Sequence, residues 1–356
     1  MRAILISFSI IIILSILVSF TRQGAHDNPQ INLRKIYSQS PEHWPKPLVS
    51  PGVQWEELGF LLWHPLFNSD SVPHLVSLGK ILFFDPRISG SGTISCGSCH
   101  KPNESWADGK EKSIGHDGAI NKRNTQSLQN VWFYKRLFWD GRSNSLEDQV
   151  FSPINSESEM HGDMPGLPRK LEKIPGYSAL FDSAFGDASI TPDRIATALA
   201  TFQRSITSNP SLFDSFLLGY TDILTDSHLR GLHVFRTKAG CMNCHYGPMF
   251  SDNQFHNNGF AGDDKGLYNQ THKEEDIGKF RTPSLRDVMF TGPWMHDGMQ
   301  RNPLRIVEQY ISPATTRRDP LIRTYNLSGR DKEDLYEFLK AISSPPIHFE
   351  IPQLPK

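Results

Sequence analysis

All four cysteines of the chain lie in two copies of the pattern C-x-x-C-H. They are Cys96 and Cys99 with His100 in the first copy, and Cys241 and Cys244 with His245 in the second. Two thiols three residues apart on a helical turn face the same side, so both can add to the vinyl groups of one haem, and the adjacent histidine is delivered to the iron. The pattern predicts two covalent c-type haems, with His100 and His245 as iron ligands.

Disulfides and a zinc site are the alternative interpretations of these cysteines, because C-x-x-C also begins many zinc-binding patterns. A zinc site would need further cysteine or histidine ligands at fixed spacings. A disulfide would break one of the motifs, since the chain has no cysteine outside them. Two haems use every cysteine, and we prefer that interpretation.

The length of 356 residues suggests two domains, and the spacing of the two motifs allows one haem in each. A formal net charge of −1 gives no long-range basic field, so nucleic-acid binding is not expected. Twenty-five prolines and 26 glycines predict long ordered loops, which a large embedded cofactor can hold in place.

The N-terminus has the character of an export signal or a membrane anchor. Arg2 precedes an apolar run from Ile4 to Phe20 that only serines interrupt. Export agrees with covalent haem attachment, which takes place on the far side of the bacterial inner membrane. We therefore expect a periplasmic protein in which residues 1–21 are the signal or anchor and residues 22–50 form a polar, proline-rich extended arm.

Helical patterns dominate the rest of the chain, and no alternation with a period of two persists long enough to predict a sheet. The segments with helical spacing or capping signals are 75–84, the stretch after Thr191-Pro192-Asp193, 228–235 and the stretch after Ser328. The expected fold is all-α, with two cytochrome-c-like domains joined by long ordered loops. Their expected ranges are 51–222 and 223–356.

Several strings of residues resemble the bacterial di-haem cytochrome c peroxidases. They are Leu82-Phe83-Phe84-Asp85-Pro86-Arg87, Ser113-Ile114-Gly115-His116, Phe138-Trp139-Asp140-Gly141-Arg142, Glu159-Met160 and Arg281-Thr282-Pro283-Ser284-Leu285-Arg286. The same superfamily contains the methylamine-utilisation (MauG-type) di-haem enzymes, which oxidise tryptophans in a partner protein. The resemblance covers most of residues 50–345 and leaves both kinds of substrate open.

The resemblance implies a division of labour between the two haems. The N-terminal haem would be the peroxide site, and the C-terminal haem would receive electrons from a donor and pass them on. His116 matches the distal histidine that blocks the first iron in resting peroxidases and would have to swing away. Glu159 matches the catalytic acid, because a carboxylate in a haem pocket can take a proton from one peroxide oxygen and return it to the other. The nearby Glu157 is not expected to share this role.

Further residues match supporting positions of the family. Gln149 and Pro153 match residues that line the peroxide pocket, and Trp139 matches an aromatic residue that lies between the haems. Asn124 matches a ligand of a calcium ion at the domain interface, where backbone carbonyls and water complete the site. The expected cofactors are therefore two c-type haems and a calcium ion, and a homodimer is usual for the family.

The chain departs from the family where the second haem normally receives its second ligand. An alignment without gaps places Gly292 at the methionine position, and glycine cannot bind iron. MauG-type enzymes use a tyrosine in this region, and none stands near Gly292. Met295 is the nearest thioether, and the weaker candidates are His296, Met289 and Met299. A thioether raises the reduction potential of the iron, whereas a histidine or an oxygen donor lowers it.

Three functions follow from these residues. The first is a periplasmic peroxidase that reduces hydrogen peroxide to water with electrons from a small cytochrome c or a cupredoxin. The second is a MauG-type enzyme that oxidatively modifies a protein partner. The third is a non-catalytic electron-transfer protein with two closed haems. His116, Glu159 and Trp139 favour the first function.

Overall fold

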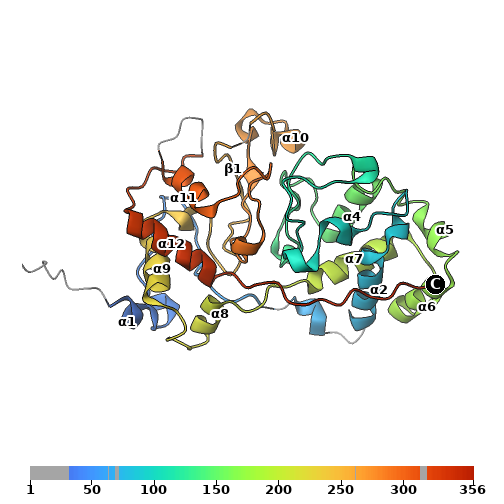
Figure 1. Cartoon of the computed structure of the whole chain (residues 1–356), viewed down its shortest axis with the longest axis horizontal. Coiled ribbons are helices and arrows are strands. Elements are labelled where there is room, and N and C mark those ends of the chain that lie inside the picture. Colours follow the sequence, from blue (N-terminus) through green and yellow to red (C-terminus); the bar gives the residue numbers. More distant parts are fainter. Residues whose placement is uncertain (1–31, 63, 69–71, 261, 313–318) are drawn as a thin grey trace, which may run out of the picture. The chain divides into compact units, whose positions relative to one another are not determined.

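Helices make up nearly all of the regular structure in the computed structural model, which describes residues 32–62, 64–68, 72–260, 262–312 and 319–356 (Figure 1). The α-helices are α1 (Leu33–Tyr37), α2 (Val72–Phe84), α3 (Cys96–Cys99), α4 (Leu146–Asn155), α5 (Leu167–Leu171), α6 (Pro175–Phe185), α7 (Pro192–Ser205), α8 (Leu212–Leu217), α9 (Asp226–Thr237), α10 (Tyr268–Thr271), α11 (Pro303–Ile311) and α12 (Gly329–Ala341). Two short antiparallel strands, β1 (Phe255–His256) and β2 (Phe280–Arg281), also pair. The prediction of an all-α fold is confirmed.

The long helices begin where their capping residues predict. The Thr191 hydroxyl accepts a 3.2 Å hydrogen bond from the backbone N–H of Arg194 at the start of α7. At the start of α12, the side chains of Ser328 and Asp331 each accept a hydrogen bond from the other residue's backbone N–H, both at 3.1 Å. These bonds satisfy N–H groups that a helix leaves unpaired at its first turn.

The first hydrophobic cluster gathers α2, α4, α6 and α7 around buried residues such as Leu78, Leu82 and Trp106. Helices α2 and α7 cross closely at Gly79. A Cβ atom at that position would lie 2.0 Å from the Ala198 carbonyl oxygen, so only glycine permits this approach. The cluster forms one wall of the region into which the first C-x-x-C-H motif projects.

The second hydrophobic cluster is built around α9 and α12, which lie side by side in Figure 1. A glycine again permits the close approach of the two helices, because a Cβ at Gly231 would lie 1.9 Å from the Asp334 carbonyl oxygen. Helix α8 also packs into this cluster through Phe213 and Phe216. The change from one cluster to the other therefore falls before α8, whereas the division into domains at residues 222 and 223 stays a prediction.

The segment predicted as an extended arm is packed and partly helical over its described residues. It begins with α1, and Tyr37 and Trp44 are buried in the second cluster. The Trp44 indole N–H is shared between the carbonyl oxygens of Tyr37 (3.0 Å) and Gln39 (2.9 Å). Burial of two large aromatic rings explains why this segment folds back despite its prolines.

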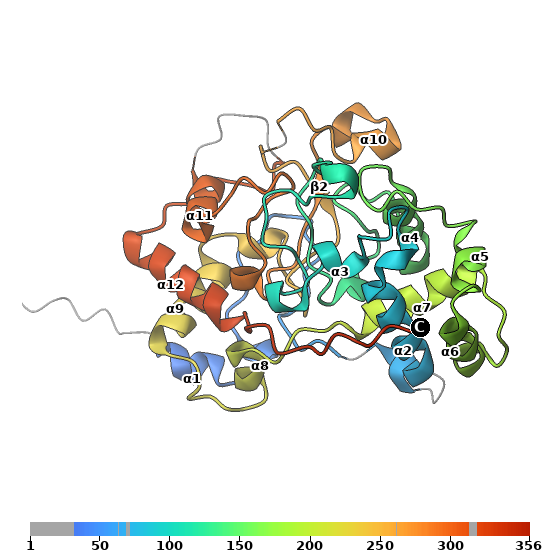
Figure 2. The ribbon, with the colours of Figure 1, turned by 45° about the vertical axis from the view of Figure 1, so that its right-hand side comes forward.

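The proposed signal or anchor at residues 1–21 lies outside the described residues. None of the helices within the described ranges combines the length and the apolar character that a bilayer span requires. At the other end of the chain, the segment after α12 runs past α2 toward α6, as Figures 1 and 2 both show.

Candidate functional site

The first C-x-x-C-H motif opens into a cavity of about 920 Å³, here called the first cavity. Helix α3 carries Cys96 and Cys99, and Ser95 caps its start in a reciprocal capping box with Ser98. Both cysteines and the following His100 line the cavity. The short capped helix therefore presents two thiols and an imidazole to one space.

A backbone carbonyl orients the His100 imidazole. Nδ1 donates a 3.0 Å hydrogen bond to the carbonyl oxygen of Trp106, which leaves Nε2 as the atom available to a metal. Burial lowers the pKa of His100, so the ring is neutral, as a metal ligand must be. Histidines that bind a metal through one ring nitrogen commonly donate the other ring N–H to a backbone carbonyl, which fixes the orientation of the ring.

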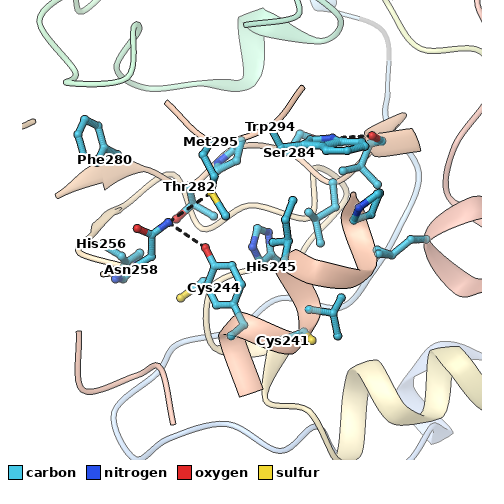
Figure 3. Close-up of a pocket in the computed structure, with 18 of the residues that line it drawn as sticks. Cys241, Cys244, His245, His256, Asn258, Phe280, Thr282, Ser284, Trp294 and Met295 are labelled. Atoms are coloured by element: carbon cyan, nitrogen blue, oxygen red, sulfur yellow. Dashed lines mark hydrogen bonds between the residues drawn. The ribbon is translucent and has the colours of Figure 1, made fainter. Parts of the chain in front are cut away.

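The second motif repeats this arrangement in a separate cavity of about 270 Å³, here called the second cavity (Figure 3). Cys241, Cys244 and His245 line it, and His245 Nδ1 donates a 2.8 Å hydrogen bond to the Phe250 carbonyl oxygen. Burial also lowers the pKa of His245. Each motif thus offers one cavity a pair of thiols and one neutral imidazole nitrogen.

The cysteines of the two motifs line two cavities, and each pair lies beside its own histidine. Burial raises the pKa of Cys96 and of Cys241 to about 12. Near the second motif, Cys244 lies close to Asp252 and His256. Burial lowers the pKa of His256, but hydrogen bonds to carboxylates outweigh it and raise the pKa to about 12.

Arg281 supplies an independent sign of an anionic group at both cavities. Its side chain lines both of them and is only 3% exposed, and its Nη1 has no hydrogen-bond partner among the described residues. A buried guanidinium N–H without an acceptor is costly. The propionate of a haem would provide that acceptor, so the residues of both cavities fit c-type haems.

Comparison with known proteins agrees with this donor set. The family model described as di-haem cytochrome c peroxidase matches residues 73–222. The methylamine utilization protein MauG of Methylophilus methylotrophus is 36% identical over 286 residues, which cover 79% of this chain and 85% of that protein. The cytochrome-c peroxidase IdrP1 of Pseudomonas sp. (strain SCT) is 34% identical over 317 residues, covering 79% and 84%.

The chain belongs to the di-haem cytochrome c peroxidase family. The family implies two c-type haems. A solved structure described as a MauG-like protein associated with microbial copper homeostasis superposes with a TM-score of 0.72 and 28% identity, covering 82% of this chain and 95% of that one. Some relatives are named MauG and others cytochrome c peroxidase, so membership of the family leaves the substrate open.

The first cavity brings together the residues that the family pattern links to peroxide chemistry. Glu159, Gln149 and Pro153 line it beside the cysteines and His100. Burial raises the pKa of Glu159, and the positive charge of Arg142 opposes this only in part. Glu157 is exposed. The carboxyl of Glu159 is therefore the one inside the cavity, with a proton affinity above that of an ordinary glutamate.

The His116 side chain lies beside the loop that carries Glu159 and His161. It is absent from the described residues that line the first cavity, and its ring instead meets the His161 ring edge-on, with the ring centroids 4.5 Å apart. Its Nε2 lies 3.2 Å from an Asp117 carboxylate oxygen. The His116 backbone N–H donates to the Glu159 carbonyl oxygen at 2.9 Å, so the two loops are coupled. In this conformation the Glu159 side of the cavity is free of the His116 side chain.

Trp139 and Asn124 line both cavities. Asn124 is 8% exposed, and its side-chain amide donates to the carbonyl oxygens of Lys110 (2.9 Å) and Glu111 (3.3 Å). Its backbone N–H donates to the His296 carbonyl oxygen at 2.8 Å, which joins the loops of the two halves. With the amide nitrogen engaged in this way, the Asn124 side-chain oxygen remains as the donor a calcium ion would use.

Met295 lines the second cavity, as the sequence suggested, but a tyrosine that sequence analysis missed lines it too. The Asn258 amide contacts both groups: its Nδ2 lies 3.0 Å from the Tyr310 hydroxyl and 3.7 Å from the Met295 sulfur. Figure 3 shows Asn258 and Met295 in the second cavity. The weaker candidates differ from one another. His296 lies flat on Phe280 at the cavity, Met289 packs against the second cluster, and Met299 is 65% exposed.

The signal for Tyr310 was present as helical spacing. Pro303, Ile306, Val307 and Tyr310 all line the second cavity from one face of α11. The sequence comparison considered only positions near Gly292, so Tyr310 on α11 was not among its candidates. The helix brings an oxygen donor to the cavity from farther along the chain.

Proposed function

We propose that this protein is a periplasmic di-haem peroxidase that reduces hydrogen peroxide in the first cavity. Electrons come from a small cytochrome c or a cupredoxin and enter through the second cavity. The observation that carries the proposal is the position of Glu159, a half-buried carboxyl with a raised pKa, in the same cavity as His100 and its two cysteines. A cavity that served electron transfer alone would need no such group.

Reduction of one hydrogen peroxide takes two electrons and two protons and releases two molecules of water. Haem iron, when bound, supplies the coordination site for peroxide and delivers the electrons. Glu159 takes the proton from the peroxide oxygen nearer the iron and returns it to the departing oxygen. Gln149, which lines the same cavity, orients the peroxide by hydrogen bonding. The raised pKa of Glu159 makes its carboxylate a stronger proton acceptor than that of an ordinary glutamate.

Trp139 connects the two cavities in this proposal, because its side chain lines both. The indole supports transfer of electrons from the second cavity to the first. Asn124 carries a calcium ion beside it, which would fix the loops that meet at Asn124 and His296. The shared position of these residues supports a division into an entry site and a peroxide site.

Two observations favour a second candidate function, oxidative modification of a protein partner as in MauG-type enzymes. His116 lies outside the first cavity, which is what a permanently open peroxide site would require. Tyr310 offers the second cavity an oxygen donor, which would lower the potential of that haem and weaken its role in electron entry. The relatives named MauG agree with this alternative.

The experiment is a comparison of Glu159→Gln with Glu157→Gln in the holoprotein. Peroxide-dependent oxidation of a reduced small cytochrome c should fall about 10²- to 10⁴-fold in Glu159→Gln and stay unchanged in Glu157→Gln. Electron exchange with the cytochrome in the absence of peroxide should survive in both variants. Normal turnover in Glu159→Gln would overturn the proposal, and absence of turnover in the parent protein would favour a non-catalytic electron carrier.

A further inference from the structure

The C-terminal segment, residues 343–356, leaves the second cluster and fastens onto the first. It starts next to α12, where the Ser344 backbone N–H donates to an Asp287 carboxylate oxygen at 2.8 Å. It ends beside α6, where the Pro355 carbonyl oxygen accepts a 2.9 Å hydrogen bond from Arg87. Figures 1 and 2 both show this segment running from α12 to the helices of the first cluster. It thus joins both clusters.

Phe349 is the point at which this segment enters the first cluster. Every other described residue of that cluster and of its packed surroundings lies between positions 75 and 206. The Phe349 ring lies 4.9 Å from the Trp106 ring and 5.6 Å from the Phe84 ring, and Lys80 Nζ stands 4.4 Å above it. The contact with Trp106 is edge-to-face, and aromatic pairs of this kind contribute about 0.5–1.5 kcal/mol beyond burial. Phe349 is therefore an anchor, while its neighbours Ile347 and Ile351 are 67% and 63% exposed.

The residue that Phe349 covers is the one that orients the proximal histidine. Trp106 supplies the carbonyl oxygen that accepts the His100 Nδ1 hydrogen bond. Its backbone has a φ of 60°, in the left-handed region that a bulky residue rarely adopts. Such a conformation persists only when surrounding contacts fix it. Packing by Phe349 on one edge of the Trp106 ring is one of those contacts.

We infer that the C-terminal segment is a positioning element for the first haem site. Through Phe349 and Trp106, it holds the carbonyl that orients His100, and it ties that carbonyl to the second cluster at Ser344. The role in peroxide reduction rests on the proposed function, whereas the positioning of His100 does not. Phe349 is a positioning residue, since it touches neither the histidine nor the cavity among the described contacts.

The experiment measures the histidine directly and uses no peroxide. In ferrous holoprotein, the iron–histidine stretching frequency from resonance Raman spectroscopy reports the hydrogen bond on the far ring nitrogen. Phe349→Ala should lower this frequency, and amide hydrogen exchange over residues 100–107 should accelerate about tenfold or more. Phe349→Tyr should leave the Raman frequency and the exchange rate at their parent values, because it keeps the aromatic ring. Ile351→Ala, in the same segment but exposed, is the matched control.

The inference is overturned if Phe349→Ala leaves the Raman frequency and the exchange of residues 100–107 equal to those of Ile351→Ala. If Phe349→Ala does not fold, Phe349→Leu provides the same comparison, since leucine keeps much of the apolar volume of the side chain and removes the aromatic ring. Loss of turnover with an unchanged Raman frequency would contradict the inference without affecting the role of Glu159. A normal Raman response in a protein without peroxidase activity would support the inference and reject the proposed function.

Discussion

The Trp139 indole N–H donates a 3.0 Å hydrogen bond to the carbonyl oxygen of Asn124, and both residues line both cavities. The bond fixes the plane of the indole where the two cavities meet. The Asn124 backbone N–H is itself bonded to the His296 carbonyl, on a loop of the second cavity. The Trp139 side chain, which lines both cavities, is thus held through Asn124 by loops of both halves.

Trp139→Phe should slow electron transfer between the haems by about tenfold or more, equivalent to about 1.4 kcal/mol in the activation free energy. The variant removes the indole and its hydrogen bond but keeps an aromatic ring. The measurement is the rate at which the reduced second haem is oxidised after peroxide is added. Trp132→Phe is the control, because Trp132 packs against the first cluster and is not among the described residues lining either cavity. Equal rates in both variants would remove Trp139 from the route.

The activity should fall on the acid side at a pH above the usual pKa of glutamate. Glu159 must be ionised to accept a proton, and burial raises its pKa, so protonation disables it as the pH falls through that raised value. Arg142 lowers the Glu159 pKa, so Arg142→Gln should move the acid limb of kcat/KM to higher pH. A limb that stays in place or moves to lower pH would show that another group controls it.

The second haem should have a thioether ligand if it is the entry point for electrons. Met295→Leu should then lower its reduction potential, because a thioether stabilises ferrous iron, while Tyr310→Phe should leave the potential nearly unchanged. Potentiometric titration followed by absorption spectroscopy measures both, and the near-infrared band of methionine-bound ferric haem provides a second readout.

The opposite pattern would favour the MauG-type alternative. In that case Tyr310→Phe raises the potential, Met295→Leu has little effect, and the near-infrared band is absent from the parent protein. Asn258 contacts both donor groups, so it is left unchanged in both variants. Each variant then tests one donor atom in otherwise equal surroundings.

Local signals made much of the fold predictable. Thr191 and Ser328 marked the starts of α7 and α12, because a capping side chain satisfies backbone groups within its own turn. The two C-x-x-C-H motifs were also predictable as the centres of two sites, because the thiols and the imidazole of each lie within five consecutive residues. The structure places each motif at its own cavity. Glu159 and Trp139 came from the resemblance of whole strings, and the structure places both at the first cavity.

Features that depend on distant contacts were missed or misplaced. Residues 33–50 pack through Tyr37 and Trp44 although their prolines suggested an extended arm, because tertiary burial outweighs local preference. Tyr310 reaches the second cavity from α11, which no spacing around Gly292 could reveal. The conformation of His116 depends on contacts with Asp117 and His161 that its own motif does not encode. Phe349 lies far from Trp106 in the sequence, and only the fold shows their contact.

The most direct test mixes the half-reduced holoprotein with hydrogen peroxide in a stopped-flow spectrometer, with and without a reduced small cytochrome c. A peroxidase should rapidly oxidise many equivalents of the cytochrome for each protein molecule, at a rate that rises with peroxide concentration. A long-lived oxidised spectrum with little oxidation of the cytochrome would contradict the proposed function and would indicate an enzyme that acts on a protein partner.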